Sequence, residues 1–170
     1  MSPTIRAPRA GELEQLREIE RAAGVLFADI GFEAVAADEP ASIETLAGYV
    51  LDGRAWLIAD DDDVPIAYAV VDIVDGLAHL EQLSVLPEHG RRGLGSALLE
   101  HVCDWAARQQ IEGVTLTTFT DVPWNAPFYA QHGFRVMNDS ELGRELRDLR
   151  AVEATHGLDP AQRVCMRRDV

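Results

Sequence analysis

The sequence predicts one domain of mixed α/β structure, of the α+β type, spanning all 170 residues. Strand-like segments in the first half adjoin one another in hairpins, which predicts antiparallel pairing. Near the middle, a glycine-rich loop separates a strand from an amphipathic helix and a further strand, which predicts a β-α-β unit. The length is typical of one compact domain, and no internal repeat or proline-rich linker divides the chain.

The first elements are predicted from short periodic runs. Residues 4–7 are expected to form a strand. Leu13, Leu16 and Ile19 recur at helical spacing and predict a helix over residues 11–23. Ser42 precedes a second apolar series and is the expected start of another helix.

Two hairpins are expected next. Residues 54–59 and 64–74 are rich in apolar and β-branched side chains, which predicts two strands. Four aspartates at 60–63 separate them, and this run favours a solvated hairpin tip, with a metal or amine site as the alternative. Asp75-Gly76 is a strong signal for a tight turn into a third strand over residues 77–86.

The remaining elements follow from the same periodicities. They are a helix from the glycine loop to about residue 109, a strand over 113–119, a short helix over 125–131, a strand over 134–137, a helix over 141–154 and a strand over 163–167.

The composition predicts a globular protein with a core of its own. Hydrophobic residues make up 47% of the chain and charged residues 26%. Cys103 and Cys165 have no metal-ligand or redox spacing, so we expect free thiols and no metal, with a disulfide between them as the alternative. There is no secretory signal and no apolar run long enough for a membrane span, so a cytoplasmic protein without a membrane partner is expected.

The net charge of −14 and the isoelectric point of about 4.6 limit the partners. An acidic surface repels phosphate backbones, which argues against a nucleic-acid partner. It attracts cationic small molecules or basic peptides, although the charge can also serve solubility alone.

The glycine-rich stretch GRRGLGS over residues 90–96 favours phosphate binding. A nucleoside-triphosphate loop needs lysine where Ser96 stands, and a dinucleotide motif needs glycine where Leu98 stands. Gly93 and Gly95 instead let backbone amides converge at the start of a helix, whose partial positive charge suits a pyrophosphate. A plain flexible turn before a helix is the alternative.

Two segments carry a resemblance to a known family. LSVLPEHGRRGLGSALL over residues 83–99 resembles the acetyl-CoA signature of the GNAT superfamily of N-acetyltransferases, and NAPFYAQHGF over residues 125–134 resembles its second motif. The resemblance implies a twisted, mostly antiparallel sheet that splits into a V, with acetyl-CoA in the V as acetyl donor. Gly90 departs from the glutamine or arginine that usually opens the signature, and the asparagine usual in the second motif is displaced to Asn125.

The resemblance also implies the site residues. Tyr129 matches the general acid that protonates the leaving thiolate. Residues implied to contact the cosubstrate are Leu83, Ser84, Val85, Gly90, Arg91, Arg92, Gly93, Leu94, Gly95, Ser96, Asn125 and Phe128.

The general base is less well defined by the sequence. Glu81 and His79 lie two apart on one predicted strand, so their side chains share a face if the strand is regular. Either group is able to take a proton from the attacking amine, with a preference for Glu81. A water chain, or two polar residues on an exposed strand face, are the alternatives.

The resemblance implies transfer of an acetyl group to a primary amine by direct attack in a ternary complex. Nothing in the motifs names the acceptor, and the charge favours a cationic small molecule or peptide. A non-catalytic acetyl-CoA sensor and an enzyme using another acyl-CoA are the alternatives. An apolar segment at 164–166 is compatible with a homodimer built through C-terminal strands.

Overall fold

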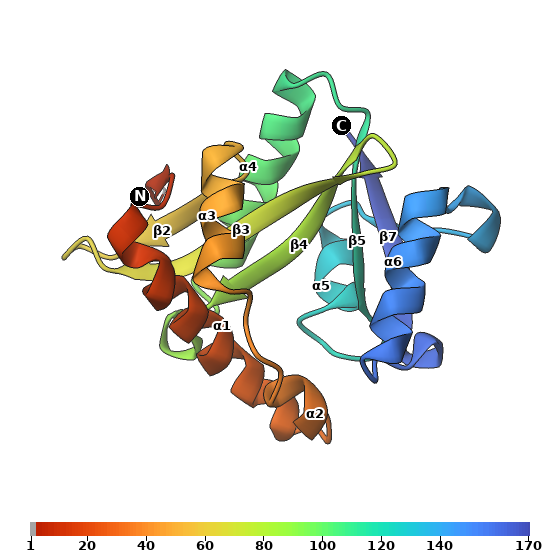
Figure 1. Cartoon of the computed structure of the whole chain (residues 1–170), viewed down its shortest axis with the longest axis horizontal. Helices are drawn as coiled ribbons and strands as arrows, with labels where there is room; N and C mark the ends of the chain where they lie inside the picture. The colour runs from red at the N-terminus through yellow and green to blue at the C-terminus, as the bar shows by residue number, and fades with distance from the viewer. Residues whose placement is uncertain (1–2) are drawn as a thin grey trace. The chain divides into compact units, whose positions relative to one another are not determined.

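The computed structural model describes residues 3–170 and contains a seven-stranded mixed sheet with helices (Figure 1). The strands are β1 Ile5–Arg6, β2 Ala55–Ala59, β3 Pro65–Val74, β4 Leu77–Val85, β5 Gly113–Phe119, β6 Arg135–Val136 and β7 Arg163–Asp169. The α-helices are α1 Leu13–Ala28, α2 Glu33–Ala36, α3 Ile43–Leu51, α4 Leu94–Arg108, α5 Ala126–Gln131 and α6 Arg144–Thr155.

The strands follow the order β1-β2-β3-β4-β5-β7-β6. β1 pairs antiparallel with β2, β2 with β3, and β7 with both β5 and β6, whereas β4 and β5 are parallel. A parallel pair needs a crossover connection, which α4 supplies. The predicted fold class and the predicted β-α-β unit are therefore confirmed.

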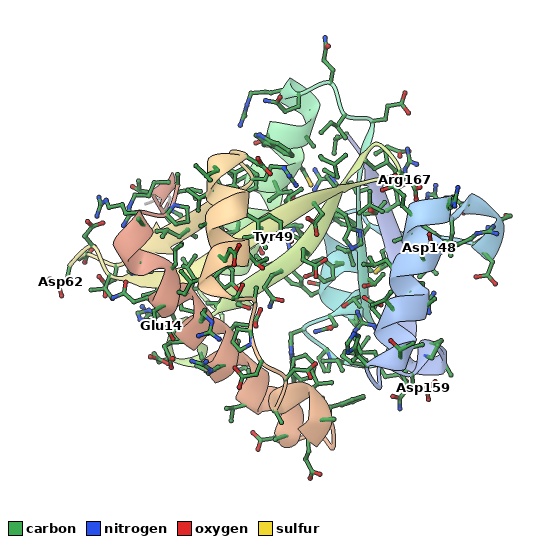
Figure 2. All side chains as sticks on the ribbon, viewed as in Figure 1. Glu14, Tyr49, Asp62, Asp148, Asp159 and Arg167 are labelled. Atoms are coloured by element: carbon green, nitrogen blue, oxygen red, sulfur yellow. The ribbon has the colours of Figure 1, made fainter. Side chains whose placement is uncertain are left out.

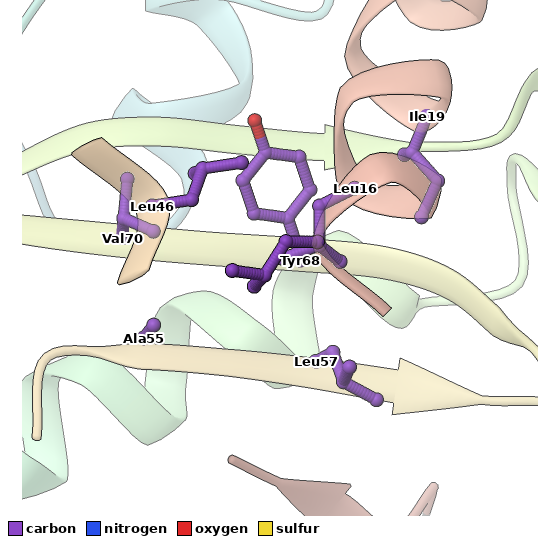
Figure 3. Packing of buried hydrophobic residues seen from close by; sticks show 8 residues of the cluster. Leu16, Ile19, Leu46, Ala55, Leu57, Tyr68 and Val70 are labelled. Atoms are coloured by element: carbon purple, nitrogen blue, oxygen red, sulfur yellow. The ribbon is translucent and has the colours of Figure 1, made fainter. Parts of the chain in front are cut away.

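The chain forms two compact units. The first comprises residues up to Asp72 together with Glu81–His101, and the second comprises Ile73–Leu80 with Val102–Val170. In the first unit, α1 and α3 bury their apolar faces against β2 and β3 (Figure 3). The core of this unit consists of Leu13, Leu16, Ile19, Leu46, Ala55, Leu57, Tyr68 and Val70.

The second unit is built on the long β5–β7 pairing, on which α6 packs. Leu146 of α6 and Cys165 of β7 belong to its buried core together with Met137. Cys103 and Cys165 are both buried free thiols, so the predicted free thiols are confirmed. β7 lies between β5 and β6, and the two-residue β6 pairs with Met166 and Arg167, so the apolar segment at 164–166 is partly covered within the sheet; the homodimer stays a prediction.

The turn between β3 and β4 anchors a distant helix within the second unit. Asp75 and Gly76 have φ values of 52° and 74°, as the predicted tight turn requires. The Asp75 carboxylate accepts hydrogen bonds from the backbone N–H groups of Glu145 (2.9 Å) and Leu146 (3.0 Å) in the first turn of α6. An added Cβ at Gly143 would lie 2.3 Å from this carboxylate, so only glycine fits there.

The four aspartates at residues 60–63 form the loop that joins β2 and β3, and Figure 2 labels Asp62 at its end. Two of its carboxylates have structural partners: Asp60 accepts from the N–H groups of Asp62 and Val64, and Asp63 pairs with Arg6 at 3.0 Å. The turn is therefore held in place by hydrogen bonds of Asp60 and by the ion pair of Asp63.

Some element bounds differ from the predicted ones. The four-residue helix α2 was not predicted, because four residues contain too little periodicity to detect. α1 extends five residues past the expected end, and Gly24 within it lies close to the backbone of Ala36 at the end of α2. In residues 3–170, no helix has the length and apolar character needed to cross a membrane.

Candidate active site

The glycine-rich loop leads from the end of β4 into α4 in the first unit. A 3-10 turn at Pro87–His89 follows β4, and α4 begins at Leu94. Gly93 has a φ of 78°, in the left-handed region where glycine is unstrained, and a Cβ added there would meet nothing within 4 Å. Gly93 is therefore required for its backbone conformation, while space beside it stays open.

The first turn of α4 has the features of an anion site. The N–H group of Ala97 donates to the carbonyl of Gly93 at 3.0 Å, so the amides of Leu94 and Gly95 come before the regular helical bonding. The first turn contains no acidic residue, and the helix is 15 residues long. The partial positive charge of such a helix end favours a phosphate group.

Two exposed arginines precede this helix. Arg91 has a φ of 61°, unusual for a residue with a side chain, and Nη1 of Arg92 lies 3.2 Å from Nδ1 of His89. Both guanidinium groups add positive charge to the loop.

The departure at Gly90 has a structural reason. The Gly90 N–H group donates to the carbonyl of Pro87 at 3.1 Å, and a Cβ added at Gly90 would also lie 3.1 Å from that oxygen. A larger residue would fit only if the Pro87 carbonyl moved by a few tenths of an ångström, so the tight turn favours glycine here.

The predicted strand residues of the site differ in exposure. Ser84 is buried, and its hydroxyl accepts a hydrogen bond from Nε2 of Gln82 at 2.7 Å. Leu83 and Val85 are half-buried. Ser84 is thus held inside the unit, and Leu83 and Val85 retain accessible surface.

Tyr129, the predicted general acid, lies on α5 in the second unit. Its ring makes edge contacts with Phe128 at 5.1 Å and Phe134 at 5.8 Å between ring centroids. Burial raises the pKa of Tyr129 above its ordinary value, so the hydroxyl keeps its proton at neutral pH. The ring is thus fixed by packing and carries a proton to donate.

The other predicted contacts on this segment have structural roles. Oδ1 of Asn125 accepts hydrogen bonds from Oγ1 of Thr118 (2.8 Å) and from the N–H group of Phe119 (3.3 Å). The side-chain oxygen of Asn125 therefore joins β5 to the start of α5. Phe128 also packs against His132, with 4.8 Å between the ring centroids.

The two predicted bases have different surroundings. His79 is buried in the second unit, and its Nδ1 lies 3.0 Å from Oγ1 of Thr115. Burial, together with the positive charge of Arg163, lowers the pKa of His79 to about 4. Glu81, by contrast, is exposed and belongs to the first unit. Although the two residues were expected to share a face of the strand, their side chains therefore have different environments.

Two pairs of polar residues in the first unit were not predicted. The Tyr68 hydroxyl donates to Oε1 of Glu20 at 3.1 Å, and the Tyr49 hydroxyl donates to Oδ2 of Asp72 at 2.9 Å (Tyr49 is labelled in Figure 2). Tyrosines in otherwise apolar runs were the available signal, because a buried hydroxyl needs a hydrogen-bond partner.

The second unit also contains a cavity of about 230 Å³. Its lining includes Asp75, Thr115, Glu141 and Arg167, but none of the site residues predicted from the sequence. Arg167 is bonded through Nε to Asp169 at 2.7 Å. The cavity's nearest link to a predicted residue is Thr115, whose Oγ1 lies 3.0 Å from Nδ1 of His79.

The comparisons with known proteins agree on a family. Residues 14–134 match the model of the acetyltransferase (GNAT) family. The chain is 28% identical over 86 residues to YjcF, an uncharacterized N-acetyltransferase of Bacillus subtilis (strain 168), and the match covers 51% of this chain and 59% of that protein.

Solved structures show the same fold. The PaiA N-acetyltransferase of Thermoplasma acidophilum, in complex with coenzyme A, has a TM-score of 0.73 at 20% identity over 100% of both chains. N-acetylglutamate synthase of Neisseria gonorrhoeae, complexed with coenzyme A and N-acetyl-glutamate, has a TM-score of 0.74 at 17% identity and covers 99% of this chain and 35% of that one.

The mixed sheet and the family match thus define an acyltransferase. The chain belongs to the acetyltransferase (GNAT) family, and its enzyme class is that of the N-acetyltransferases.

Proposed function

We propose that the protein transfers an acetyl group from acetyl-CoA to a primary amine of a small molecule or peptide, by direct attack in a ternary complex. The observation that carries the proposal is the loop at 90–96, which leads into a helix N-terminus without acidic residues, in a chain of this family. Solved relatives with this fold were crystallised with coenzyme A, which supports the choice of donor.

The cosubstrate is expected to bind through backbone groups of the first unit. Amides from Arg91 to Ser96 would hold the pyrophosphate, with Arg91 and Arg92 adding charge. Backbone groups of Leu83 and Val85 would pair with the pantetheine, and a backbone N–H near Val85 would stabilise the oxyanion. The open space beside Gly93 fits such a ligand.

The reaction requires two proton movements. The acceptor amine must lose a proton before it can attack, and the departing thiolate must gain one. We assign the second step to Tyr129, whose raised pKa keeps the hydroxyl protonated in the neutral range. For the first step, His79 is buried and its Nδ1 lies 3.0 Å from Oγ1 of Thr115, so it is poorly placed to meet an amine, which favours a carboxylate.

The acceptor is expected to be cationic, because the chain has a net charge of −14. Two buried free thiols are typical of a reducing compartment, which supports action in the cytoplasm.

Calorimetric titration of acetyl-CoA tests the donor, with ATP and desulfo-CoA as control ligands. We expect micromolar binding of acetyl-CoA and no binding of ATP. Thiol release is then measured with 1,4-diaminobutane, an aminoglycoside and a basic peptide, and release with at least one is expected. Binding without release on any amine would favour the sensor, and absence of binding would refute the proposal.

A further inference from the structure

A carboxylate on α1 is hydrogen bonded to a tyrosine inside the first unit. The Tyr68 hydroxyl donates to Oε1 of Glu20 at 3.1 Å, and Tyr68 is only 1% exposed. Figure 3 shows its ring between Leu16 and Leu46. This packing fixes the hydroxyl, and with it the position of the carboxylate that the hydroxyl binds.

Glu20 differs from the other acidic residues of the same helix. Glu14 and Glu18 are exposed and form ion pairs with Arg17 and Arg21, respectively. Among residues 3–170, Glu20 is half-buried and has no cation within ion-pair distance; its one hydrogen bond comes from a neutral phenol. A carboxylate withdrawn from water without a cation is costly, and binding a cation offsets that cost.

The groups around Glu20 come from five segments. Burial raises the pKa of Glu20, Asp38 raises it further, and the Tyr68 hydroxyl and the charges of Arg17 and Arg21 lower it. Glu81 on β4 contributes negative charge near the Tyr68 hydroxyl that binds Glu20. Its charge raises the pKa of Tyr68 and also that of Tyr49 of α3.

The charges near Glu20 are mixed: Arg17 and Arg21 already pair with Glu14 and Glu18, whereas Asp38 and Glu81 add negative charge. Asp72, which accepts from the Tyr49 hydroxyl, differs from Glu20 because Nη1 of Arg54 lies 3.9 Å from its Oδ1. A cation entering here would find Glu20 as the carboxylate with neither an ion pair nor a solvated surface position.

We propose that Glu20 is the catalytic residue that binds the ammonium group of the acceptor and takes its proton, while Tyr68 positions the carboxylate. This inference rests on the proposed N-acetyltransferase function and replaces the strand residues His79 and Glu81 in the role of general base. It also names the acceptor as an amine that arrives protonated.

The step balances as follows. The ammonium N–H bond breaks, its proton forms a bond to a carboxylate oxygen of Glu20, and the electron pair remains on nitrogen. The neutral amine attacks the thioester carbonyl, the C–S bond breaks, and the thiolate takes a proton from Tyr129. The nitrogen of the new amide loses its second proton to restore Tyr129, and Glu20 releases its proton to solvent.

The first test compares Glu20→Gln with the matched control Glu18→Gln, using 1,4-diaminobutane as the acceptor. Near neutral pH, loss of a general base is expected to lower kcat/KM by about 10²- to 10⁴-fold in Glu20→Gln. The loss should shrink toward about pH 11, where an alkyl amine with a pKa of about 10.4 is largely neutral. Glu18→Gln should stay within about twofold of the wild type, since exposed pairs contribute little.

Two further variants sharpen this test. Tyr68→Phe removes a hydrogen bond that favours the charged carboxylate, so it should shift the acid limb of the kcat/KM profile to higher pH. Acetyl-CoA affinity is measured in every variant and should be unchanged. A pH-independent loss in Glu20→Gln, no loss, or a pH-dependent loss found in Glu81→Gln instead would overturn the inference.

A second measurement does not need turnover. Carboxyl carbons of ¹³C-labelled protein are followed by NMR, and the signal missing in Glu20→Gln identifies Glu20. Addition of 1,4-diaminobutane should shift this signal, and it should leave the Glu18 signal in place. An unmoved Glu20 signal at saturating amine refutes the inference, whereas failure of acetyl-CoA to bind the wild type refutes the proposed function itself.

Discussion

The starts of α4 and α6 show two uses of the same helix chemistry. At α6, a carboxylate of the protein occupies the helix end, since Asp75 accepts from the amides of Glu145 and Leu146. At α4, the first turn contains no acidic residue, and the chain arrives through Arg91, Arg92 and Gly93. The start of α6 is capped by a side chain of the protein, whereas the start of α4 has the charge pattern of an anion-binding site.

The glycines show the same difference. Gly143 before α6 is needed because an added Cβ would strike the Asp75 carboxylate at 2.3 Å. Gly93 before α4 has open space around it and is needed for its φ of 78°. Gly143 is thus fixed by a contact within the protein, whereas the space beside Gly93 leaves the start of α4 accessible.

The largest effect is expected from a negative charge at the open helix end. Gly93→Glu should weaken acetyl-CoA binding by at least about 100-fold, because the carboxylate repels the pyrophosphate and the backbone conformation is strained. Gly157→Glu is the matched control, since Gly157 has a φ of 85° and equally open surroundings. Calorimetry measures the acetyl-CoA affinity of both variants. Equal affinities would contradict the assignment of the start of α4 as the anion-binding site.

The next effect separates an enzyme from a sensor. Tyr129→Phe keeps the ring packing with Phe128 and Phe134 but removes the proton donor. We expect kcat to fall by about 100-fold while acetyl-CoA affinity is retained. Thiol-release kinetics and calorimetry test this, and an unchanged kcat would exclude Tyr129 as the acid.

A smaller effect is expected at the completed helix end. Gly143→Ala should lower the free energy of unfolding by about 2 kcal/mol, because the methyl group displaces the Asp75 carboxylate from the first turn of α6. Gly48→Ala, in the open interior of α3, should instead stabilise by about 0.5–1 kcal/mol. Urea denaturation compares the two variants, and equal stabilities would show that the cap contributes nothing.

The smallest effect concerns a third helix start, that of α1. Glu12 accepts from the N–H group of Arg9, and its ion pair with Arg6 at 2.8 Å lowers the pKa of its carboxyl. This stabilisation is present above the unfolded pKa of about 4.3 and is lost as the pH falls through the lowered folded value. Glu12→Gln should cost about 1 kcal/mol at neutral pH and much less in acid, as urea denaturation at both pH values can show.

Local signals in the sequence predicted most elements. Asp75-Gly76 predicted a turn, and Ser42 predicted a helix start, where its hydroxyl indeed accepts from the N–H group of Thr45. The glycine loop was found because its residues are contiguous. Each of these features depends on neighbours within a few positions, which a single sequence displays.

Contacts between distant positions could not be predicted in this way. The partner of Asp75 lies 70 residues later, and Glu20 and Tyr68 are 48 residues apart. Nothing in the local pattern around Glu20 distinguishes it from Glu14 or Glu18 on the same helix. Only the fold shows which of these carboxylates turns inward, so the proposal of Glu20 as general base could not have come from the strand pattern that pointed to His79 and Glu81.

The Asp75 contact also has a consequence for the order of folding. Its 70-residue span means that the first turn of α6 gains its cap only after a long loop has closed. α6 is a 12-residue helix, a length that is marginal in isolation. We therefore expect α6 to form late in folding, after the β3–β4 hairpin, so that the C-terminal part of the chain is the slowest to become protected from hydrogen exchange.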